Sequence, residues 1–433
     1  MQENKAKKGD DIVLGKDRSN AQRIAAFLSV AIIYFFYCYN FMVGTFVRPT
    51  MIKPIAEGGF GFQLSQASAI FAIMSFSTIP GTILYGIIST KIGKKRTLIT
   101  IALAIAATTF LPLLSPTNFT LWRIARFTTG LSLGGVFGTA VPLVTEMFPQ
   151  KYRGKLAAIL TSLFSVAMIF AGQLYGVLGD SNWKILVLTA VIPPVVGAVL
   201  AFFLIPDDKE LTKKRNEEAK DKGEKISYLS MYKGKYLFIG IGVILLSGAN
   251  FTAYSAFSNN ATTYLKTVIG VSAATAGSIY SLQGIGQLIG YNVWGFIADR
   301  FGRKKPAIGM ALCAAMLFIY MQLGPKDVTT FKIVTLSLGL CIGFSGAWGA
   351  YYTELFPKKF NGLSAGISFN GGRIISSFAL PMIAGVASTS AGMVGIFRIA
   401  MIIFIAGAVL WAFLPETLNK EDVNEKAVAA DCN

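Results

Sequence analysis

The chain carries long apolar segments that recur from Ala21 to Leu414. A helix that spans a membrane needs about 20 mostly apolar residues, and it satisfies its own backbone hydrogen bonds inside hydrocarbon. With 53% hydrophobic and 14% charged residues among 433, the composition excludes an ordinary soluble protein. The sequence therefore predicts an all-α membrane protein with twelve transmembrane helices. The predicted spans are 24–47, 66–89, 97–114, 120–146, 156–178, 184–205, 236–258, 272–297, 307–324, 330–355, 362–385 and 392–414.

A charged segment divides these spans into six and six. It covers 206–235 and is rich in Lys and Glu. We therefore expect two six-helix bundles, 24–205 and 236–414, with tails at 1–23 and 415–433. The first tail is polar and basic and has no apolar core, so we expect no signal peptide.

The net charge is +18, from 40 basic and 22 acidic residues. Most Lys and Arg fall in the tails and in loops on one predicted side, which is the positive-inside pattern. The sequence thus predicts a multi-pass protein of the cell membrane with both termini in the cytosol. Its partners would be the lipid bilayer and a small molecule, not nucleic acid. The chain has no histidine, and its four cysteines lack metal-like spacing, so we expect no metal or other cofactor.

Two motifs recur at matching places in the two halves. GIISTKIGKKR, from Gly86, follows the second span, and GFIADRFGRKK, from Gly295, follows the eighth. The fourth span ends in T-E-M-F-P at Glu146, and the tenth ends in T-E-L-F-P at Glu354. This repetition predicts a duplicated six-helix unit.

These motifs carry a family resemblance. The loop G-x-x-x-D-R-x-G-R-K from Gly295, and the R-x-x-x-G segment from Arg126 to Gly130, resemble signature motifs of the major facilitator superfamily. The resemblance covers nearly the whole chain. It implies two six-helix bundles around a central site, working by alternating access. We expect a transporter and not an enzyme, acting as a monomer.

Within that superfamily, the sequence is similar to several branches. The L-P-E-T tail that begins at Leu414 resembles that of sugar porters, as does S-G-A-N ending at Asn250. The sugar porters' Gln-Gln pair is replaced here by Ile244 and Leu245. The segment from Arg373 to Pro381 resembles one in aromatic-acid and organic-anion transporters, where the arginine is associated with a carboxylate substrate. The span-one carboxylates of bacterial aromatic-acid symporters are absent, because Tyr-Cys-Tyr-Asn occupies that stretch.

Arg373 is the leading candidate for substrate contact. It lies about 16 Å into its predicted span, near the middle of the membrane. A guanidinium at that depth needs water, a partner or a ligand, and its fork suits a carboxylate. The alternative is an arginine satisfied by helix ends or carbonyl groups. Arg48, near the outer end of the first span, either attracts anions or snorkels to the interface.

The other candidate substrate-binding residues are polar or aromatic side chains in the spans, and ordinary packing is the alternative for each. They are Asn370, Tyr37, Asn40, Asn250, Tyr254, Gln283, Gln287, Arg126, Trp348 and Tyr351.

The repeated loops predict a gate, in which acids and arginines at the cytosolic helix ends hold the bundles in one state. The alternative is that basic loops only set orientation and glycines only form turns. Thr90 stands where the first loop usually has Asp, which predicts a weaker network in the first half. The gating candidates are Asp299, Arg300, Arg303, Gly295, Glu146, Glu354, Arg153 and Arg96.

Together these features predict a secondary transporter for a small organic anion, an aromatic, hydroxy or dicarboxylic acid. The 22 acids fall in loops, in tails or at the ends of spans, with Glu146 and Glu354 at cytosolic ends, and no ATP-binding loop is present. We therefore expect a facilitator or an anion exchanger. The alternatives are a proton-coupled carboxylate symporter and a sugar or polyol facilitator.

Overall fold

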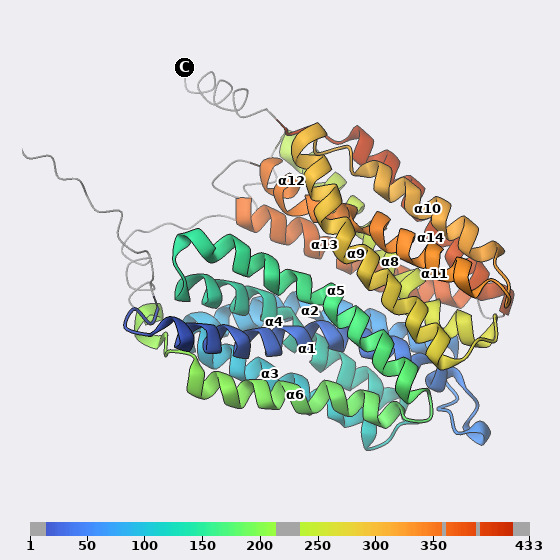
Figure 1. Cartoon of the computed structure of the whole chain (residues 1–433), viewed down its shortest axis with the longest axis horizontal. Coiled ribbons are helices and arrows are strands. Elements are labelled where there is room, and N and C mark those ends of the chain that lie inside the picture. Colours follow the sequence, from blue (N-terminus) through green and yellow to red (C-terminus); the bar gives the residue numbers. More distant parts are fainter. Residues whose placement is uncertain (1–13, 214–233, 357–360, 387–389, 419–433) are drawn as a thin grey trace, which may run out of the picture. The chain divides into compact units, whose positions relative to one another are not determined.

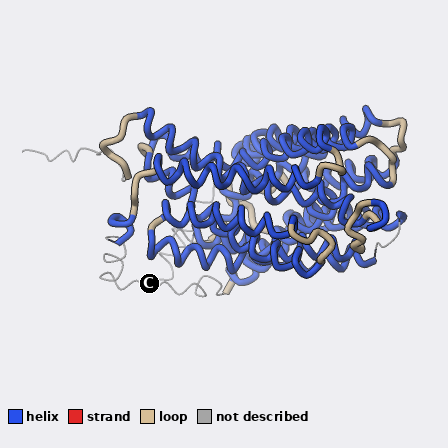
Figure 2. Tube along the Cα trace, turned by 90° about the horizontal axis from the view of Figure 1, so that it is seen from below, coloured by secondary structure: helices blue, strands red, loops and turns tan. Residues whose placement is uncertain are grey.

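The computed structural model describes residues 14–213, 234–356, 361–386 and 390–418. Within these ranges the chain consists of helices and short loops, with no strand (Figure 2). Nine helices of this described part are long and apolar enough to cross a membrane. The predicted all-α membrane class is confirmed. Most of both predicted tails and most of the predicted linker lie outside the described residues.

The chain divides into two compact units (Figure 1). Unit 1 comprises Met1–Lys225 together with Ala261–Ser281, and unit 2 comprises Ile226–Asn260 together with Leu282–Asn433. The helix α8 (Lys235–Thr267) therefore begins in unit 2 and ends in unit 1.

Unit 1 contains six long helices and two short 3-10 turns. Ser19 caps the first helix, since its hydroxyl accepts from the Gln22 backbone while the Gln22 side chain accepts from the Ser19 backbone. The elements are α1 (Asn20–Ile52), η1 (Ile55–Glu57), α2 (Leu64–Ile92), α3 (Lys94–Phe110), η2 (Leu111–Leu113), α4 (Phe119–Met147), α5 (Gln150–Leu178) and α6 (Trp183–Leu204).

Unit 2 follows the same plan with one interruption. The predicted tenth span is broken by a 3-10 segment, so it consists of α11, η4 and α12. The seventh span is a longer helix than predicted. Besides α8, the elements are α9 (Ala273–Phe301), α10 (Ala307–Gln322), α11 (Val328–Ile342), η4 (Gly343–Ala347), α12 (Trp348–Glu354), α13 (Asn361–Val386) and α14 (Ser390–Phe413).

Both units use glycine to bring two helix backbones together. In unit 1 a Cβ at Gly134 would lie 2.0 Å from the Thr78 carbonyl oxygen, so α4 packs directly on α2. In unit 2 a Cβ at Gly286 would lie 2.0 Å from the Leu336 carbonyl oxygen, so α9 packs on α11 in the same way. Small residues permit this approach where no hydrophobic effect drives helices together.

The segment Ala261–Ser281 belongs to unit 1 through specific contacts. Lys266 forms an ion pair with Asp180, and the Ser281 hydroxyl donates to the Ile169 carbonyl at 3.1 Å. A Cβ at Gly277 would lie 2.3 Å from the Gly172 carbonyl oxygen. These contacts fix the ends of α8 and α9 against α5.

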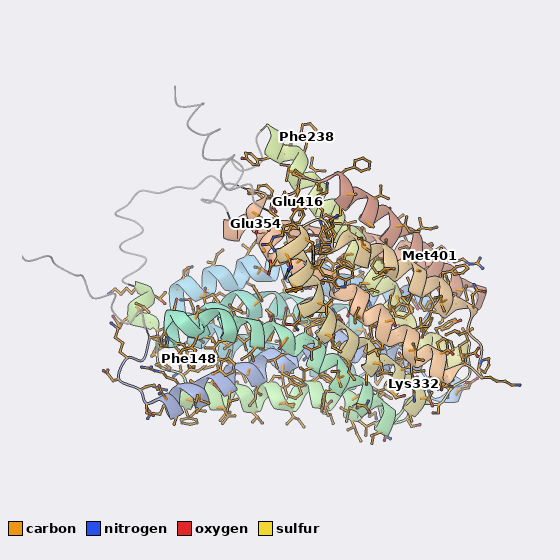
Figure 3. All side chains as sticks on the ribbon, turned by 45° about the horizontal axis from the view of Figure 1, so that its top comes forward. Phe148, Phe238, Lys332, Glu354, Met401 and Glu416 are labelled. Atoms are coloured by element: carbon orange, nitrogen blue, oxygen red, sulfur yellow. The ribbon has the colours of Figure 1, made fainter. Side chains whose placement is uncertain are left out.

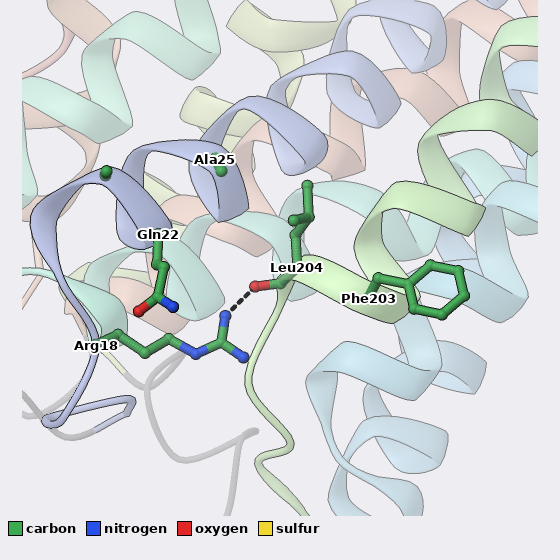
Figure 4. A pocket seen from close by; sticks show the side chains of 6 residues that line it. Arg18, Gln22, Ala25, Phe203 and Leu204 are labelled. Carbon is green, nitrogen blue, oxygen red and sulfur yellow. Dashed lines mark hydrogen bonds between the residues drawn. The ribbon is translucent and has the colours of Figure 1, made fainter.

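The two ends of unit 1 differ in chemistry. The motif end, where Gly93 and Glu146 lie, also holds a pocket of about 400 Å³ beside the start of α1. There the Arg18 guanidinium donates to the Leu204 carbonyl (Figure 4). The far end is closed by aromatic side chains. The Phe60 ring centre is 4.8 Å from that of Trp183 and 6.0 Å from that of Trp122.

Candidate functional site

Arg373 lies near the middle of α13 and is half-buried in unit 2. Its guanidinium carbon is 5.0 Å from the centre of the Phe251 ring and 5.8 Å from that of Phe369. The two rings meet edge to face at 5.0 Å. Such cation–π contacts stabilise a cation by about 0.5–2 kcal/mol. The cation therefore sits in an aromatic setting made by α8 and α13.

A glycine brings these two helices together. A Cβ at Gly372 would lie 2.4 Å from the Ser247 carbonyl carbon and 2.5 Å from the Gly248 nitrogen, so no larger residue fits there. The crossing at Gly372 places the next residue, Arg373, beside Phe251 one turn along α8. Asn370, half-buried, lies one turn before Arg373 on the same helix.

Buried amides form a second feature of unit 2. The Gln283 side-chain nitrogen donates to the Ser258 hydroxyl at 2.7 Å, and that of Gln287 donates to the Tyr291 hydroxyl at 2.5 Å. The side-chain oxygens of Gln283, Gln287 and Asn250 are buried and accept no hydrogen bond from the described residues. Buried polar groups are nearly always paired. Whichever way each glutamine amide is turned, one polar end remains available to a ligand.

Aromatic residues of α12 lie against α8. The Tyr352 hydroxyl is hydrogen-bonded to that of Ser247 at 2.8 Å, and Trp348 stacks on Tyr352 with ring centres 5.2 Å apart. The indole N–H of Trp348 is buried without a partner among the described residues. Tyr351 has a different setting, since its hydroxyl donates to the Pro415 carbonyl at 2.8 Å. Tyr351 therefore anchors the chain after α14, while Trp348 keeps a donor for a ligand.

The candidates in unit 1 also differ from one another. Asn40 is fully buried and makes three hydrogen bonds, donating to the carbonyls of Phe36 and Ala190 and accepting from Thr109 at 2.9 Å. It therefore joins α1 to α3 and α6. Tyr37 is half-buried beside the rings of Tyr34 and Phe41, and Arg126 is buried on α4.

The loop after α9 forms a dense network in unit 2. Arg303 donates to both oxygens of Glu354 at 2.7–3.1 Å, and it also pairs with Asp299. The Thr417 hydroxyl donates to Glu354 at 2.6 Å. Glu416 accepts the Arg303 and Lys304 backbone N–H groups at 2.8 and 3.1 Å. Glu354 and Glu416 lie close together at one end of the unit (Figure 3).

The charges of this network change each other's proton affinity. Hydrogen bonds that Arg303 donates to Glu354, and then to Asp299, raise the pKa of Arg303 against the opposing effect of burial. Burial alone would raise the pKa of Glu416, but four backbone N–H groups, those of Leu418, Lys304, Arg303 and Thr417, together lower it. Both groups are therefore held in their charged forms.

The matching loop in unit 1 holds two separate ion pairs. Lys94 pairs with Glu146 at 2.9 Å, and Asp208 accepts the Lys94 and Lys95 backbone N–H groups at 2.6 and 3.1 Å. The Arg96 guanidinium pairs with Asp207 at 2.9 Å, where both side chains are about half exposed.

The chain matches the family model for the Major Facilitator Superfamily over residues 30–259 and 243–431. It belongs to the Major Facilitator Superfamily. It is similar to the glucose transporter GlcP of Staphylococcus epidermidis, with 27% identity over 80% of this chain and 85% of that one. It is also similar to the sialic acid transporter NanX of Escherichia coli, with 24% identity over 84% and 87%. Among solved structures, a D-xylose–proton symporter shares the fold, with a TM-score of 0.70, 18% identity, and coverage of 92% and 99%.

The structure of this superfamily member assigns partners to some predicted gating residues and not to others. Glu354, Arg303 and Asp299 come together in one network. Arg300 is exposed and lies over the Phe301 ring instead. At Gly295 a Cβ would meet nothing within 4 Å, so close packing does not require glycine there. The side chain of Arg153 lies outside the described residues.

Sequence reasoning missed several residues of these superfamily loops. Among the described residues, Lys94 pairs with Glu146, and Arg96 pairs with Asp207. The repeat contained the signal. Lys94 follows Gly93 as Arg303 follows Gly302, and Pro-Asp-Asp after α6 matches Pro-Glu-Thr after α14. Phe251 and Phe369 carried no such signal, because their contact with Arg373 depends on the crossing of α8 and α13.

Proposed function

We propose that this superfamily member moves a small organic anion, an aromatic, hydroxy or dicarboxylic acid, across the cell membrane by alternating access. It acts as a monomer with both termini in the cytosol. The observation that carries the proposal is the Arg373 guanidinium, set in mid-helix beside the paired rings of Phe251 and Phe369. A guanidinium binds a carboxylate through paired hydrogen bonds, and aromatic walls suit a flat apolar body.

The buried amides of unit 2 narrow the chemical class of the proposed substrate. Asn250, Gln283 and Gln287 each keep a buried oxygen that accepts no hydrogen bond from the described residues. A carboxylate alone has no donor for these oxygens, whereas hydroxyl groups do. The amides thus favour a carboxylate that also carries hydroxyls. The similarity to a sialic acid transporter is consistent with an acid as substrate.

The mode of transport follows from the distribution of charge. The 22 acids fall in loops, in tails or at the ends of predicted spans, whereas proton symport usually relies on a titratable group deeper in the membrane. We propose facilitated diffusion or anion exchange, in which the bound anion offsets the charge of Arg373. The alternative, proton symport, would be supported by uptake that rises steeply with an inward proton gradient and is indifferent to counter-substrate inside the vesicle.

The gate is proposed to lie in the charged loops. Asp299, Arg303 and Glu354 would hold one state of the cycle, together with Lys94 and Glu146 in unit 1. Asp299→Asn should slow transport and leave substrate binding intact, because the Asp299 side chain is largely exposed and belongs to the loop region. A folded variant that no longer binds substrate would contradict this role.

The first test is a thermal-shift panel on the purified protein, since a ligand bound only by the folded state raises its melting temperature. Carboxylates of graded size are compared with neutral sugars, in wild type and in Arg373→Gln. Loss of a charge-assisted pair should weaken carboxylate binding about 10- to 100-fold. Arg398→Gln is the matched control, because Arg398 is an exposed arginine of the same unit. A carboxylate shift that survives in Arg373→Gln would refute the proposal.

A sugar or polyol is the second candidate. The buried amides of Asn250, Gln283 and Gln287, and the similarity to a glucose transporter, favour it. In the same panel, a shift from a neutral sugar that is unchanged in Arg373→Gln would make Arg373 a structural residue. The sugar or polyol facilitator would then become the leading candidate function.

A further inference from the structure

Arg48 is a buried cation at the far end of unit 1. Its side chain is 1% exposed, so it does not snorkel to the membrane interface. The guanidinium donates to the Ser68 hydroxyl, reaches the Leu64 carbonyl at 3.5 Å, and lies 5.3 Å from the centre of the Phe71 ring. Its Nε is buried with no hydrogen-bond partner among the described residues.

Arg126 is a second buried cation in the same unit, 4% exposed. Its best polar contact is weak, since one terminal nitrogen lies 3.7 Å from the Met74 sulfur. The guanidinium carbon is 5.7 Å from the centre of the Trp122 ring. Trp122 belongs to the aromatic cluster that closes this end of unit 1.

The two arginines converge on one position. A Cβ at Gly44 of α1 would lie 2.8 Å from the edge of the Phe71 ring and 3.4 Å from a terminal nitrogen of Arg126. The Phe71 ring is the same one that Arg48 contacts. The Phe71 ring and the Arg126 guanidinium therefore both pack against Gly44, and Arg48 lies on the same ring.

No acidic side chain offsets these two charges. Neither arginine forms an ion pair with any residue of the described ranges. Burying an ion costs several kcal/mol even after relaxation. A cation–π contact returns about 0.5–2 kcal/mol, so the aromatic and sulfur contacts do not cover the cost of two cations. A bound anion would.

We propose that Arg48 and Arg126 form an anion site in unit 1 that takes a small oxyanion such as a sulfate or a carboxylate. The Nε of Arg48 and the terminal nitrogens of Arg126 donate to its oxygens. The aromatic cluster of Phe60, Trp122 and Trp183 keeps this end dry, which strengthens the charge interaction. The inference rests on contacts of unit 1 alone and does not depend on the proposed function.

The test is a titration of the purified full-length protein with sodium sulfate, and separately with sodium succinate, against sodium chloride of equal ionic strength. Melting temperature is the readout. Wild type should gain a saturable shift from at least one oxyanion. Arg48→Gln and Arg126→Gln should each weaken that binding at least tenfold. Arg123→Gln is the matched control, because Arg123 is an exposed arginine on the same helix as Arg126.

Arg373→Gln separates the two proposals. If it keeps the sulfate or succinate shift while the unit 1 variants lose it, the second site is supported. If only Arg373→Gln loses the shift, the unit 1 site is refuted and the carboxylate site in unit 2 stands. A response to sulfate alone identifies an inorganic ion, and a response to succinate alone an organic one. A wild type that responds to neither oxyanion refutes the site.

A second measurement covers variants that fold poorly. Arg48→Lys and Arg126→Lys keep the charge but lose the guanidinium fork, so they should fold and bind the oxyanion at intermediate strength. In buffer without an oxyanion, Arg126→Gln should melt no lower than wild type, because it removes an unpaired buried charge. A lower melting temperature with unchanged sulfate binding would mean that Arg126 is structural.

Discussion

The charged loops of the two units have the same plan and different strength. In unit 1, the single ammonium group of Lys94 donates to both oxygens of Glu146, at 2.9 and 3.0 Å. In unit 2, Arg303 meets both oxygens of Glu354 and pairs with Asp299 as well. After α6, Asp208 caps two backbone N–H groups, as Glu416 does after α14. The duplicated fold thus preserves the positions of the charges while the residues set how firmly each loop is held.

The difference follows from the side chains themselves. An arginine presents a planar fork that binds a carboxylate at two points, whereas a lysine presents a point charge on a flexible stem. Unit 2 also has a carboxylate one turn before the cation, at Asp299, where unit 1 has Thr90. The Thr90 hydroxyl donates to the Ile87 carbonyl instead. Among the described residues, Arg303 therefore has two carboxylate partners where Lys94 has one.

The largest expected effect comes from removing the central carboxylate of each loop. Glu354→Gln deprives Arg303 and Thr417 of a charged acceptor and should destabilise the protein by about 2–3 kcal/mol. Glu146→Gln deprives Lys94 of a charged acceptor, and we expect a smaller loss of about 1 kcal/mol. The melting temperatures of the two purified variants, measured side by side, give the comparison. Equal losses, or a larger loss for Glu146→Gln, would show that the two loops are equally strong.

Sequence alone predicted the plan of these loops and an arginine partner for Glu354, but not the pairing of Lys94 with Glu146 or of Arg96 with Asp207. The repeated G-x-x-x-x-x-x-G motif and the T-E-x-F-P ends placed Glu146 and Glu354 correctly, because both are read from the order of residues. The choice of Lys94 over Arg96 depends on which side chain points inward at the start of α3. Hydropathy does not encode that direction. The capping acids after α6 and α14 were visible in the repeat but lay in predicted tail and linker.

The same limit applies to the helices. Apolar length predicted the helix positions well, since a membrane span requires it. The break of the tenth span at η4 and the extension of α8 to Thr267 depend on packing between helices. The burial of Arg48 was also unpredictable from hydropathy, because a cation near a span end usually reaches the interface.

A smaller effect, and a pH dependence, should come from Glu416. Burial alone would raise the pKa of Glu416, but backbone N–H groups hold this pKa below its ordinary value of 4.5. A lowered pKa means that the stabilisation is present above pH 4.5 and is lost as the pH falls through the folded pKa. Glu416→Gln should therefore lower the melting temperature at pH 7 and approach wild type in acid. The effect at pH 7 is expected near 1 kcal/mol, since the group is partly exposed.

The control for this prediction is a melting series from pH 7 to pH 3.5 for both proteins in the same detergent. A gap between wild type and Glu416→Gln that stays constant across the series would mean that the carboxylate charge contributes nothing. Asp207→Asn serves as the exposed counterpart in unit 1. Burial raises the pKa of Asp207, but the hydrogen bond and charge of Arg96, with smaller contributions from Lys209 and Lys95, together lower it. Half exposure leaves little stability to lose.

The smallest effect should come from exchanging the residue one turn before the cation. Thr90→Asp would place a carboxylate four residues before Lys94, as Asp299 stands before Arg303, and should stabilise unit 1 by about 0.3–0.5 kcal/mol. Asp299→Thr should destabilise unit 2 by a similar amount, because the Asp299 side chain is 69% exposed and exposed pairs contribute little. The two changes in melting temperature should shrink in high salt.

A double-mutant cycle decides whether the new carboxylate in unit 1 acts through Lys94. In a Lys94→Gln background, the gain from Thr90→Asp should disappear, since the partner charge is gone. A gain that persists would point to a different cause, such as loss of the Thr90 hydrogen bond to Ile87. If the gain depends on Lys94 and slows transport as well, then the missing acid of unit 1 is what keeps that loop easier to open than its counterpart in unit 2.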